Sequence, residues 1–286
     1  MKEEHVLSTP IKTVSLLPNR SKEASIKKAL EIADILNQKG VTVKAPEWLS
    51  CKKQSGNVYK ETDAIIVFGG DGTVLNTALP AACFNVPILS INTGKIGYLT
   101  ALEENEFFDI DSFLAGNFDI ERRMMIDCEI IRNGISVFGG TALNEVVVSK
   151  GSLSRMMYFR LYCGTKDYME YRADAIIVST PTGSTAYSMS AGGAVIDPSL
   201  DCIQVTPICP YTLSGARHMI FSPNSQIRIN VTETNNSEAW LTEDGRYSYQ
   251  LESGDDIILK RSQKEVSLIK LNTKSFCDIL VTKLNG

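Results

Sequence analysis

The sequence predicts an α/β domain built on a parallel sheet, followed by a second domain that is mostly β-strand. Strand and helix signals alternate through the first third of the chain, as they do where helices join parallel strands. After about residue 116 the helix signals become rare, and β-rich runs follow one another. Between two of these runs, Asn133-Gly134 is a hairpin turn signal.

In the first domain we expect strands at 13–17, 41–43, 64–68 and 87–91. The run at 64–68 is unbroken, β-branched and aromatic, which is typical of a strand buried in a parallel sheet. A helix is expected from Ser21, as its N-cap, to about Lys39, and Gly40 should end it. The apolar residues of this segment that follow helical spacing are Ile26, Ala29, Leu30 and Ala33. A further helix is expected at 103–115.

In the second domain the expected strands are 124–131, 135–138, 145–149, 157–163, 175–179, 226–231, 256–260 and 266–271. Helices are expected only near 184–191 and at 275–284. We therefore divide the chain into an α/β domain at 1–116, a β-rich domain at 117–270 and a C-terminal segment at 271–286. The last segment is expected to pack back on the first domain.

Composition excludes several classes of function. The chain has 286 residues, 43% hydrophobic and 22% charged, with a net charge of -4. Proteins that bind nucleic acid usually carry a basic excess, so no nucleic-acid partner is expected. No apolar run approaches the roughly 18 residues of a membrane span, and the N-terminus lacks the apolar core of a signal peptide. We expect a cytoplasmic protein that contacts no membrane.

Cysteine and histidine usage agrees with this expectation. The seven cysteines are widely spaced and form no CxxC pair, so reduced thiols are expected. The two histidines, His5 and His218, stand in no recognisable triad or metal motif. We predict no metal site made by protein side chains alone.

The sharpest chemical feature is Gly69-Gly70-Asp71-Gly72-Thr73, directly after the expected strand 64–68. Glycines permit close approach by a ligand, and backbone amides at such a turn can bind phosphate. Asp71 would repel phosphates unless it accepts a proton from an attacking hydroxyl or helps to hold magnesium. A plain Asp-Gly turn is the alternative explanation.

A second feature runs from Thr180 to Ser188 as TPTGSTAYS and is followed by Ala191-Gly192-Gly193. Hydroxyls and free amides at a helix start suit the polar edges and phosphates of a nucleotide. A well-capped helix is the alternative.

Three shorter features are ambiguous by themselves. Asn144-Glu145 could bracket ribose hydroxyls or could be a solvent-exposed pair at a strand edge. Arg172 and Asp174 could form a surface ion pair, which would contribute little stability. The run 243–246 (EDGR) would by itself be taken as a turn. Neither GxxxxGK[ST] nor GxGxxG occurs, so a nucleotide site must be built in another way.

Together these stretches resemble the NAD kinase family, the ATP- or polyphosphate-dependent kinases that make NADP. The resemblance runs in order through VFGGDGT, NTGKIGYLT, NEVVV, ADAIIVSTPTGSTAYSMSAGGAVIDPSL and TPICPYTLS. GGDGT is shared with diacylglycerol and sphingosine kinases, whereas STPTGSTAY followed by SAGG is far more specific. The chain differs from many members at Asn76, Lys95, Tyr211 and Arg246, where contacts to the phosphate donor or between subunits are in question.

The resemblance implies a two-domain fold with the active site between the domains, and a role for each matching residue. Asp71 matches the catalytic proton acceptor. The phosphate loop would be Gly69, Gly70, Gly72 and Thr73. The NAD-binding set would be Asp71, Gly72, Asn144, Glu145, Arg155, Arg172, Asp174, Thr182, Thr185, Ala186, Tyr187, Ser188 and Ser190. The resemblance also implies a homodimer or homotetramer that uses NAD, ATP or polyphosphate. Mg²⁺ or another divalent cation would be carried mainly on the phosphate donor.

Two other functions stay open at the level of sequence. A lipid kinase shares GGDGT but would need a large apolar groove for its acceptor, and it leaves STPTGSTAY unexplained. A non-catalytic sensor of NAD or NADP would not need Asp71.

Overall fold

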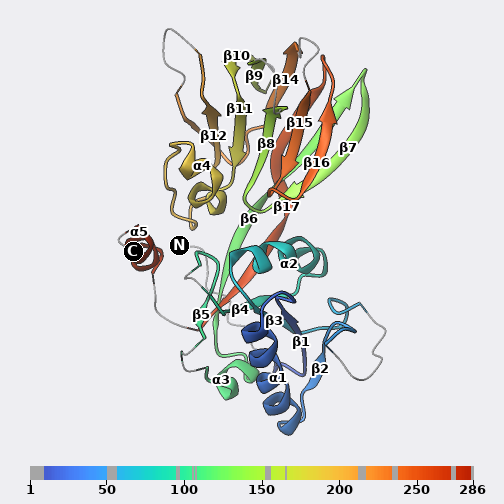
Figure 1. Cartoon of the computed structure of the whole chain (residues 1–286), viewed down its shortest axis with the longest axis vertical. Helices are drawn as coiled ribbons and strands as arrows, with labels where there is room; N and C mark the ends of the chain where they lie inside the picture. Colours follow the sequence, from blue (N-terminus) through green and yellow to red (C-terminus); the bar gives the residue numbers. More distant parts are fainter. Residues whose placement is uncertain are drawn as a thin grey trace. The chain divides into compact units, whose positions relative to one another are not determined.

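The computed structural model describes residues 10–49, 57–94, 97–104, 106, 108–151, 156–164, 166–211, 217–233, 238–271 and 275–284 (Figure 1). The chain forms two compact units, Met1–Arg123 with Val266–Gly286, and Met124–Glu265. The divisions fall inside two long strands, β6 (Asp119–Arg132) and β17 (Asp256–Lys270). The domain borders at 116 and 270 stay a prediction.

The first unit is built on a parallel sheet in the order β2-β1-β3-β4. The strands are β1 (Thr13–Pro18), β2 (Thr42–Lys44), β3 (Ala64–Phe68) and β4 (Ile88–Asn92). Each lies within one residue of its predicted position. All five residues of β3 are buried, as expected for a central parallel strand.

Helix α1 (Glu23–Gln38) buries one stripe made of Ser25, Ala29, Ile32 and Leu36. It ends as predicted at Gly40, whose φ of +76° suits glycine, and the amide of Val41 donates to the carbonyl of Leu36. The prediction that Ser21 caps the helix is wrong. The N-cap is Lys22, because the amide and hydroxyl of Ser21 instead donate to the side chain of Asn19.

Two helical features of the first unit differ from expectation. Helix α2 (Asp71–Phe84) was not predicted; it contains Pro80 and has many small apolar residues rather than a clear amphipathic period. The helix expected at 103–115 is wrong in its first half. The short strand β5 (Leu102–Glu103) pairs with β4 there, and among the described residues of this range only α3 (Ile110–Leu114), capped by Asp109, is helical.

The second unit is mostly β, as predicted. One antiparallel sheet has the order β13-β12-β11-β8-β15-β16. Its strands are β8 (Glu145–Lys150), β11 (Ala175–Ser179), β12 (Ile203–Ile208), β13 (Met219–Phe221), β15 (Ala239–Glu243) and β16 (Tyr247–Leu251).

The remaining strands of this unit include β7 (Ile135–Ala142), β9 (Met157–Cys163), β10 (Lys166–Ala173) and β14 (Ile227–Glu233). One apolar core joins residues of both strand groups, for example Val148 of β8, Phe159 of β9 and Ile229 of β14. The predicted hairpin between β6 and β7 is present, with positive φ at Asn133 and Gly134.

Two predictions for the rest of the chain need correction. The strands expected at 256–260 and 266–271 are one strand, β17, in whose polar middle Arg261 forms ion pairs with Asp201 and Glu265. The helix expected near 184–191 is a 3₁₀ turn, η1 (Thr182–Thr185), followed by one α-helical turn, α4 (Tyr187–Ser190). Helix α5 (Phe276–Leu284) is close to its predicted position. Within the described residues, we find no helix long and apolar enough to cross a membrane.

Candidate active site

The glycine loop connects the buried strand β3 to the start of α2. A Cβ on Gly69 would lie 2.3 Å from Oγ1 of Thr73, so the loop admits only glycine there. A Cβ on Gly70 or on Gly72 would meet no atom within 4 Å. The Cα atoms of these two glycines therefore face open space at the N-terminus of α2, where an approaching phosphate would meet no side chain.

Asp71 is the first residue of α2, and its carboxylate is held in a fixed orientation. Its Oδ1 accepts a hydrogen bond from the backbone amide of Leu99, and its Oδ2 accepts one from the backbone amide of Tyr98, both at 2.9 Å. A Cβ on Gly97 would lie 2.2 Å from Oδ1, so the close approach of this loop requires glycine. A carboxylate has about four lone-pair sites. Two are taken by these amides, and the side chain is 35% exposed, so a proton can still be accepted.

In the second unit the key organiser is Asp244, in the run that the sequence indicated as a plain turn. Its buried carboxylate accepts hydrogen bonds from the backbone amides of Leu143, Asn144 and Glu145, at 3.0, 2.7 and 3.2 Å. Arg246 lies 3.1 Å from Oδ2 and offsets the buried charge. The turn that leads into β8 is thus fixed by a side chain about a hundred positions away.

Asn144 and Glu145 carry polar atoms that the described part of the protein leaves unsatisfied. Oδ1 of Asn144 and Oε2 of Glu145 are buried and have no hydrogen-bond partner among the described residues. Glu145 is 6% exposed. Burial raises its pKa to about 7, the negative charge of Asp244 adds to this, and the amide of Tyr187 opposes it. Buried acceptors without partners are uncommon, and a ligand that offers hydroxyl or amine donors would satisfy them.

The segment from Thr180 onward packs directly against this turn. The amide of Thr180 donates to the carbonyl of Asn144 at 2.9 Å, and its hydroxyl donates to the carbonyl of Leu143 at 2.6 Å. A Cβ on Gly183 would lie 2.1 Å from the carbonyl oxygen of Asn144. Two motifs that are distant in sequence therefore pack directly against each other within the second unit.

The residues after Gly183 divide into internal and exposed groups. Ser188 is fully buried, and its Oγ lies 2.9 Å from Oγ1 of Thr206 and 2.8 Å from the side-chain amide of Gln204. A Cβ on Gly193 would collide with Gln204, which explains this glycine structurally. Tyr187 and Ser190 are exposed, Thr185 and Ala186 are half-buried, and Thr182 is buried.

Arg172 and Asp174 do not pair with each other in the contacts of this structure. Asp174 forms an ion pair with Lys150 at 2.8 Å. The guanidinium of Arg172 lies over the rings of Tyr158 and Tyr211, 5.4 and 5.3 Å from their centroids. Sequence reasoning took Asp244 only as part of a turn and missed Lys150 and Tyr158, because each of the three acts through a tertiary contact. Arg155 and Lys95 lie outside the described residues.

The described residues contain no group of three or more His, Cys, Asp or Glu side chains that could hold a metal ion. The carboxylate of Asp71 is in part committed to the amides of Tyr98 and Leu99. A divalent cation at the glycine loop would therefore take most of its ligands from a bound phosphate group.

The comparisons with known proteins agree over nearly the whole chain. The profile of the ATP-NAD kinase N-terminal domain matches residues 52–118, and that of the ATP-NAD kinase C-terminal domain matches residues 143–271. The NAD kinase of Caldanaerobacter subterraneus is 35% identical over 96% of this chain and 99% of its own length. That of Symbiobacterium thermophilum is 40% identical over 81% of each chain.

Solved structures are similar in fold. The NAD kinase from Archaeoglobus fulgidus, in complex with ATP, matches with a TM-score of 0.73 at 25% identity, over 96% of this chain and 98% of that one. Yeast NADH kinase complexed with NADH has a TM-score of 0.83 at 21% identity, over 97% of this chain and 87% of that one, and shows the shared fold. By its domains, its curated relatives and its fold, this chain belongs to the NAD kinase family.

Proposed function

We propose that this chain transfers the terminal phosphoryl group of ATP to the 2′-hydroxyl of the adenosine ribose of NAD, giving NADP. The observation that carries this proposal is the fixed carboxylate of Asp71 within a glycine loop whose Gly70 and Gly72 are open to a ligand. A turn or a sensor would not need an oriented carboxylate beside a phosphate site. The family membership supplies the identity of acceptor and donor.

In the proposed reaction Asp71 accepts the proton of the 2′-hydroxyl as the oxygen attacks phosphorus. The amides of Tyr98 and Leu99 keep the carboxylate in one orientation while this happens. The backbone at Gly70 and Gly72 faces the phosphates and stabilises charge on them. A divalent cation, which we propose to be magnesium, supplies further charge neutralisation when it is bound with the donor.

We propose that the second unit binds NAD through the surface around Asn144 and Glu145. Their buried, unsatisfied oxygens fit ribose hydroxyls or an exocyclic amine, and Asp244 keeps both residues in place. Tyr187 offers an exposed ring for stacking. In the same proposal, the set of residues that build the NAD site also includes Arg172, Asp174, Thr182, Thr185, Ala186, Ser188 and Ser190. Because Ser188 is internally hydrogen-bonded, it would support this surface rather than touch the ligand with its hydroxyl.

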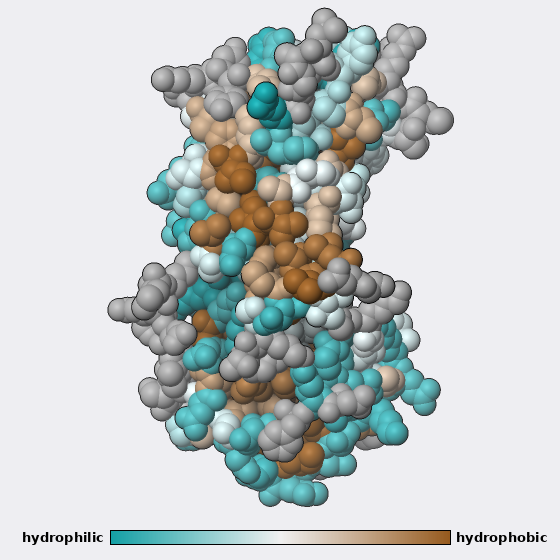
Figure 2. Space-filling model, turned by 90° about the vertical axis from the view of Figure 1, so that its left-hand side faces the viewer, coloured by the Kyte–Doolittle hydropathy of each residue, from teal (hydrophilic) through white to brown (hydrophobic). Residues whose placement is uncertain are grey.

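Several finer properties belong to this proposal through the family resemblance. These are a cytoplasmic location, polyphosphate as an alternative donor, and assembly as a homodimer or homotetramer. Figure 2 shows apolar side chains gathered on a face of the second unit. Large apolar residues exposed in this unit include Val195 and Leu200 after α4, and Ile220 in β13. Such a surface would suit contact with another copy of the chain.

One assay tests the proposal against its alternatives. The purified protein is incubated with ATP, magnesium and NAD, and the product is detected with an NADP-specific dehydrogenase. NADP formation supports the kinase. Binding of NAD without turnover would support a sensor, and phosphorylation of diacylglycerol but not NAD would support a lipid kinase. Polyphosphate in place of ATP, and EDTA in place of magnesium, test the donor and the cation.

A further inference from the structure

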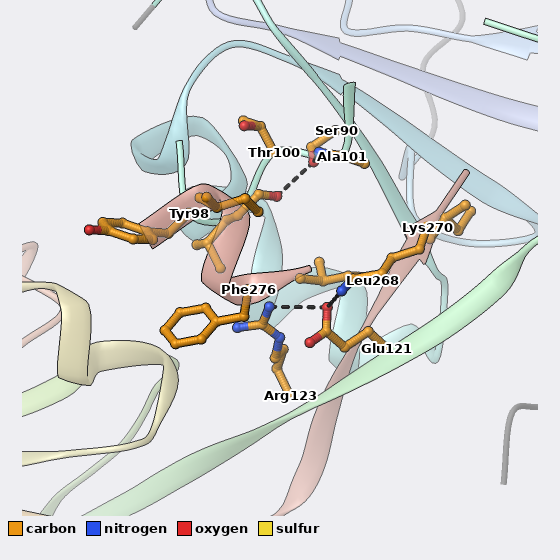
Figure 3. Close-up of a pocket in the computed structure, with 12 residues that line it drawn as sticks. Ser90, Tyr98, Thr100, Ala101, Glu121, Arg123, Leu268, Lys270 and Phe276 are labelled. Atoms are coloured by element: carbon orange, nitrogen blue, oxygen red, sulfur yellow. Dashed lines mark hydrogen bonds and ion pairs between the residues drawn. The ribbon is translucent and has the colours of Figure 1, made fainter. Parts of the chain in front are cut away.

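Helix α5 is attached to the first unit through a few side chains near its start. Phe276 and Ile279 line a cavity of about 30 Å³ together with Tyr98, Leu99 and Leu268 (Figure 3). No described side chain of α5 is fully buried. The helix is therefore docked at the loop 97–99 that holds Asp71, rather than being part of the core.

The last turn of α5 brings a positive charge to Asp71. The Nζ of Lys283 lies 3.6 Å from Oδ2 of Asp71 and 3.8 Å from the ring centroid of Tyr98. Its side chain is 23% exposed, so it lies partly shielded from solvent against these two residues. Two cations that line the cavity, Arg123 and Lys270, lie 3.1 and 2.9 Å from Glu121. Among these three, Lys283 is the one directed toward the glycine loop.

The ion pair between Lys283 and Asp71 is loose. At 3.6 Å the two groups attract each other, but the contact is longer than an ordinary hydrogen bond. The ammonium has three N–H donors, and its flexible four-carbon stem can move toward a ligand. A hydroxyl bound to Asp71 would lie about 2.6–3.2 Å from the carboxylate. The phosphorus would lie about 3–3.5 Å beyond that hydroxyl in a near-attack arrangement. The reacting phosphoryl group is thus within reach of Lys283.

We propose that Lys283 contacts the transferring phosphoryl group and stabilises its charge, so that the C-terminal helix supplies a catalytic residue. This inference rests on the proposed function. In the step concerned, the bond between the 2′-oxygen and phosphorus forms as the bond between phosphorus and the bridging oxygen of ADP breaks. The hydroxyl proton passes to Asp71, and ADP carries away the electron pair of the broken bond. Lys283 stays protonated and gains hydrogen bonds to phosphoryl oxygens as it loosens from Asp71.

The opposite role for the same contact is inhibition. If Lys283 only occupied Asp71 in the free enzyme, it would compete with the hydroxyl and would have to leave before turnover. Removal of the charge would then speed the reaction, whereas the proposal requires that it slow the reaction. The two roles therefore differ in the sign of a single measurement.

The test compares Lys283→Met and Lys283→Arg with the wild type in the coupled NADP assay. Methionine keeps a long apolar stem on the Tyr98 ring and removes the charge. We expect kcat of Lys283→Met to fall about 10²-fold, the order found on removal of one charge-stabilising donor. The apparent constant for NAD should be unchanged, and Lys283→Arg should restore part of kcat. Lys27→Met, on the exposed face of α1, is the matched control and should behave as wild type.

Each outcome of this test decides the inference. Equal kcat for Lys283→Met and wild type would overturn it, and a higher kcat would establish the inhibitory role instead. No NADP from the wild type would overturn the proposed function as well. If Lys283→Met fails to fold, Phe276→Ala tests the same idea because it loosens α5 and leaves the lysine charge present. We expect kcat to fall in that variant too, and an unchanged or raised kcat would refute the role of α5.

Discussion

Replacement of Glu145 by Gln should change how the stability of the protein depends on pH. The carboxyl is buried beside Asp244, and its pKa is raised from 4.5 to about 7, first by burial and then by that neighbouring charge. The folded state therefore binds a proton more tightly than the unfolded state does. Its contribution to stability is fully present below the unfolded pKa and is lost as pH rises through the folded pKa.

The size of this effect follows from the two pKa values. A shift of one pKa unit corresponds to about 1.4 kcal/mol. From about pH 5 to about pH 8, ionisation of Glu145 should cost the wild type roughly 2–3 kcal/mol of unfolding free energy. Glutamine keeps the shape of the side chain and does not ionise. The unfolding free energy of Glu145→Gln should therefore rise relative to wild type by that amount over the same range.

Urea unfolding of both proteins across this pH range measures the difference. Other titrating groups are shared by the two proteins and cancel. Glu104→Gln, at an exposed position, controls for the loss of a carboxylate as such. Parallel pH curves for wild type and Glu145→Gln would refute the reasoning, because they would mean that the carboxyl has the same affinity for protons in both states.

Three further predictions concern the proposed NAD surface. Asn144→Ala or Glu145→Ala should raise the apparent constant for NAD more than that for ATP in steady-state kinetics; equal effects on both substrates would indicate a structural role. Gly183→Ala should lower stability by about 1–3 kcal/mol and weaken NAD binding, because its Cβ would lie 2.1 Å from a backbone oxygen. Gly139→Ala, whose Cβ would have no neighbour closer than 4.0 Å, is its control, and equal melting temperatures for the two variants would contradict the packing argument. Saturating NAD or NADP should slow hydrogen exchange both at 69–75 and at 174–190 if one ligand contacts both units; protection confined to one unit would favour a sensor.

The parts of the fold that sequence predicted are those with a strong local signal. The apolar run of β3 and the Asn133-Gly134 hairpin turn are encoded within a few residues, and both were predicted correctly. Helix α2 was missed because it is apolar on most sides and contains Pro80, so it shows no clear helical period. The single strand β17 was divided in two because its middle is polar.

The candidate site divides in the same way. The motifs around Asp71 and Asn144 are contiguous in sequence and could be found there. The role of Asp244 could not be found in this way, since its carboxylate accepts hydrogen bonds from three backbone amides about a hundred positions away. Lys283 likewise reaches Asp71 through a helix at the other end of the chain. Contacts of this kind arise from tertiary packing and leave no local pattern.

The most direct test of the central claim is the turnover and NAD affinity of Asp71→Asn. Asparagine offers one acceptor oxygen, so one of the two amide contacts from Tyr98 and Leu99 is lost, and a thermal melt should confirm that the fold persists. With proton acceptance removed, kcat should fall roughly 10²–10⁴-fold while the Kd for NAD, measured by calorimetry, changes little. Asp34→Asn, at an exposed position on α1, is the control and should retain wild-type kcat. Full turnover in Asp71→Asn would contradict the assignment of Asp71 as the proton acceptor, and with it the proposed mechanism.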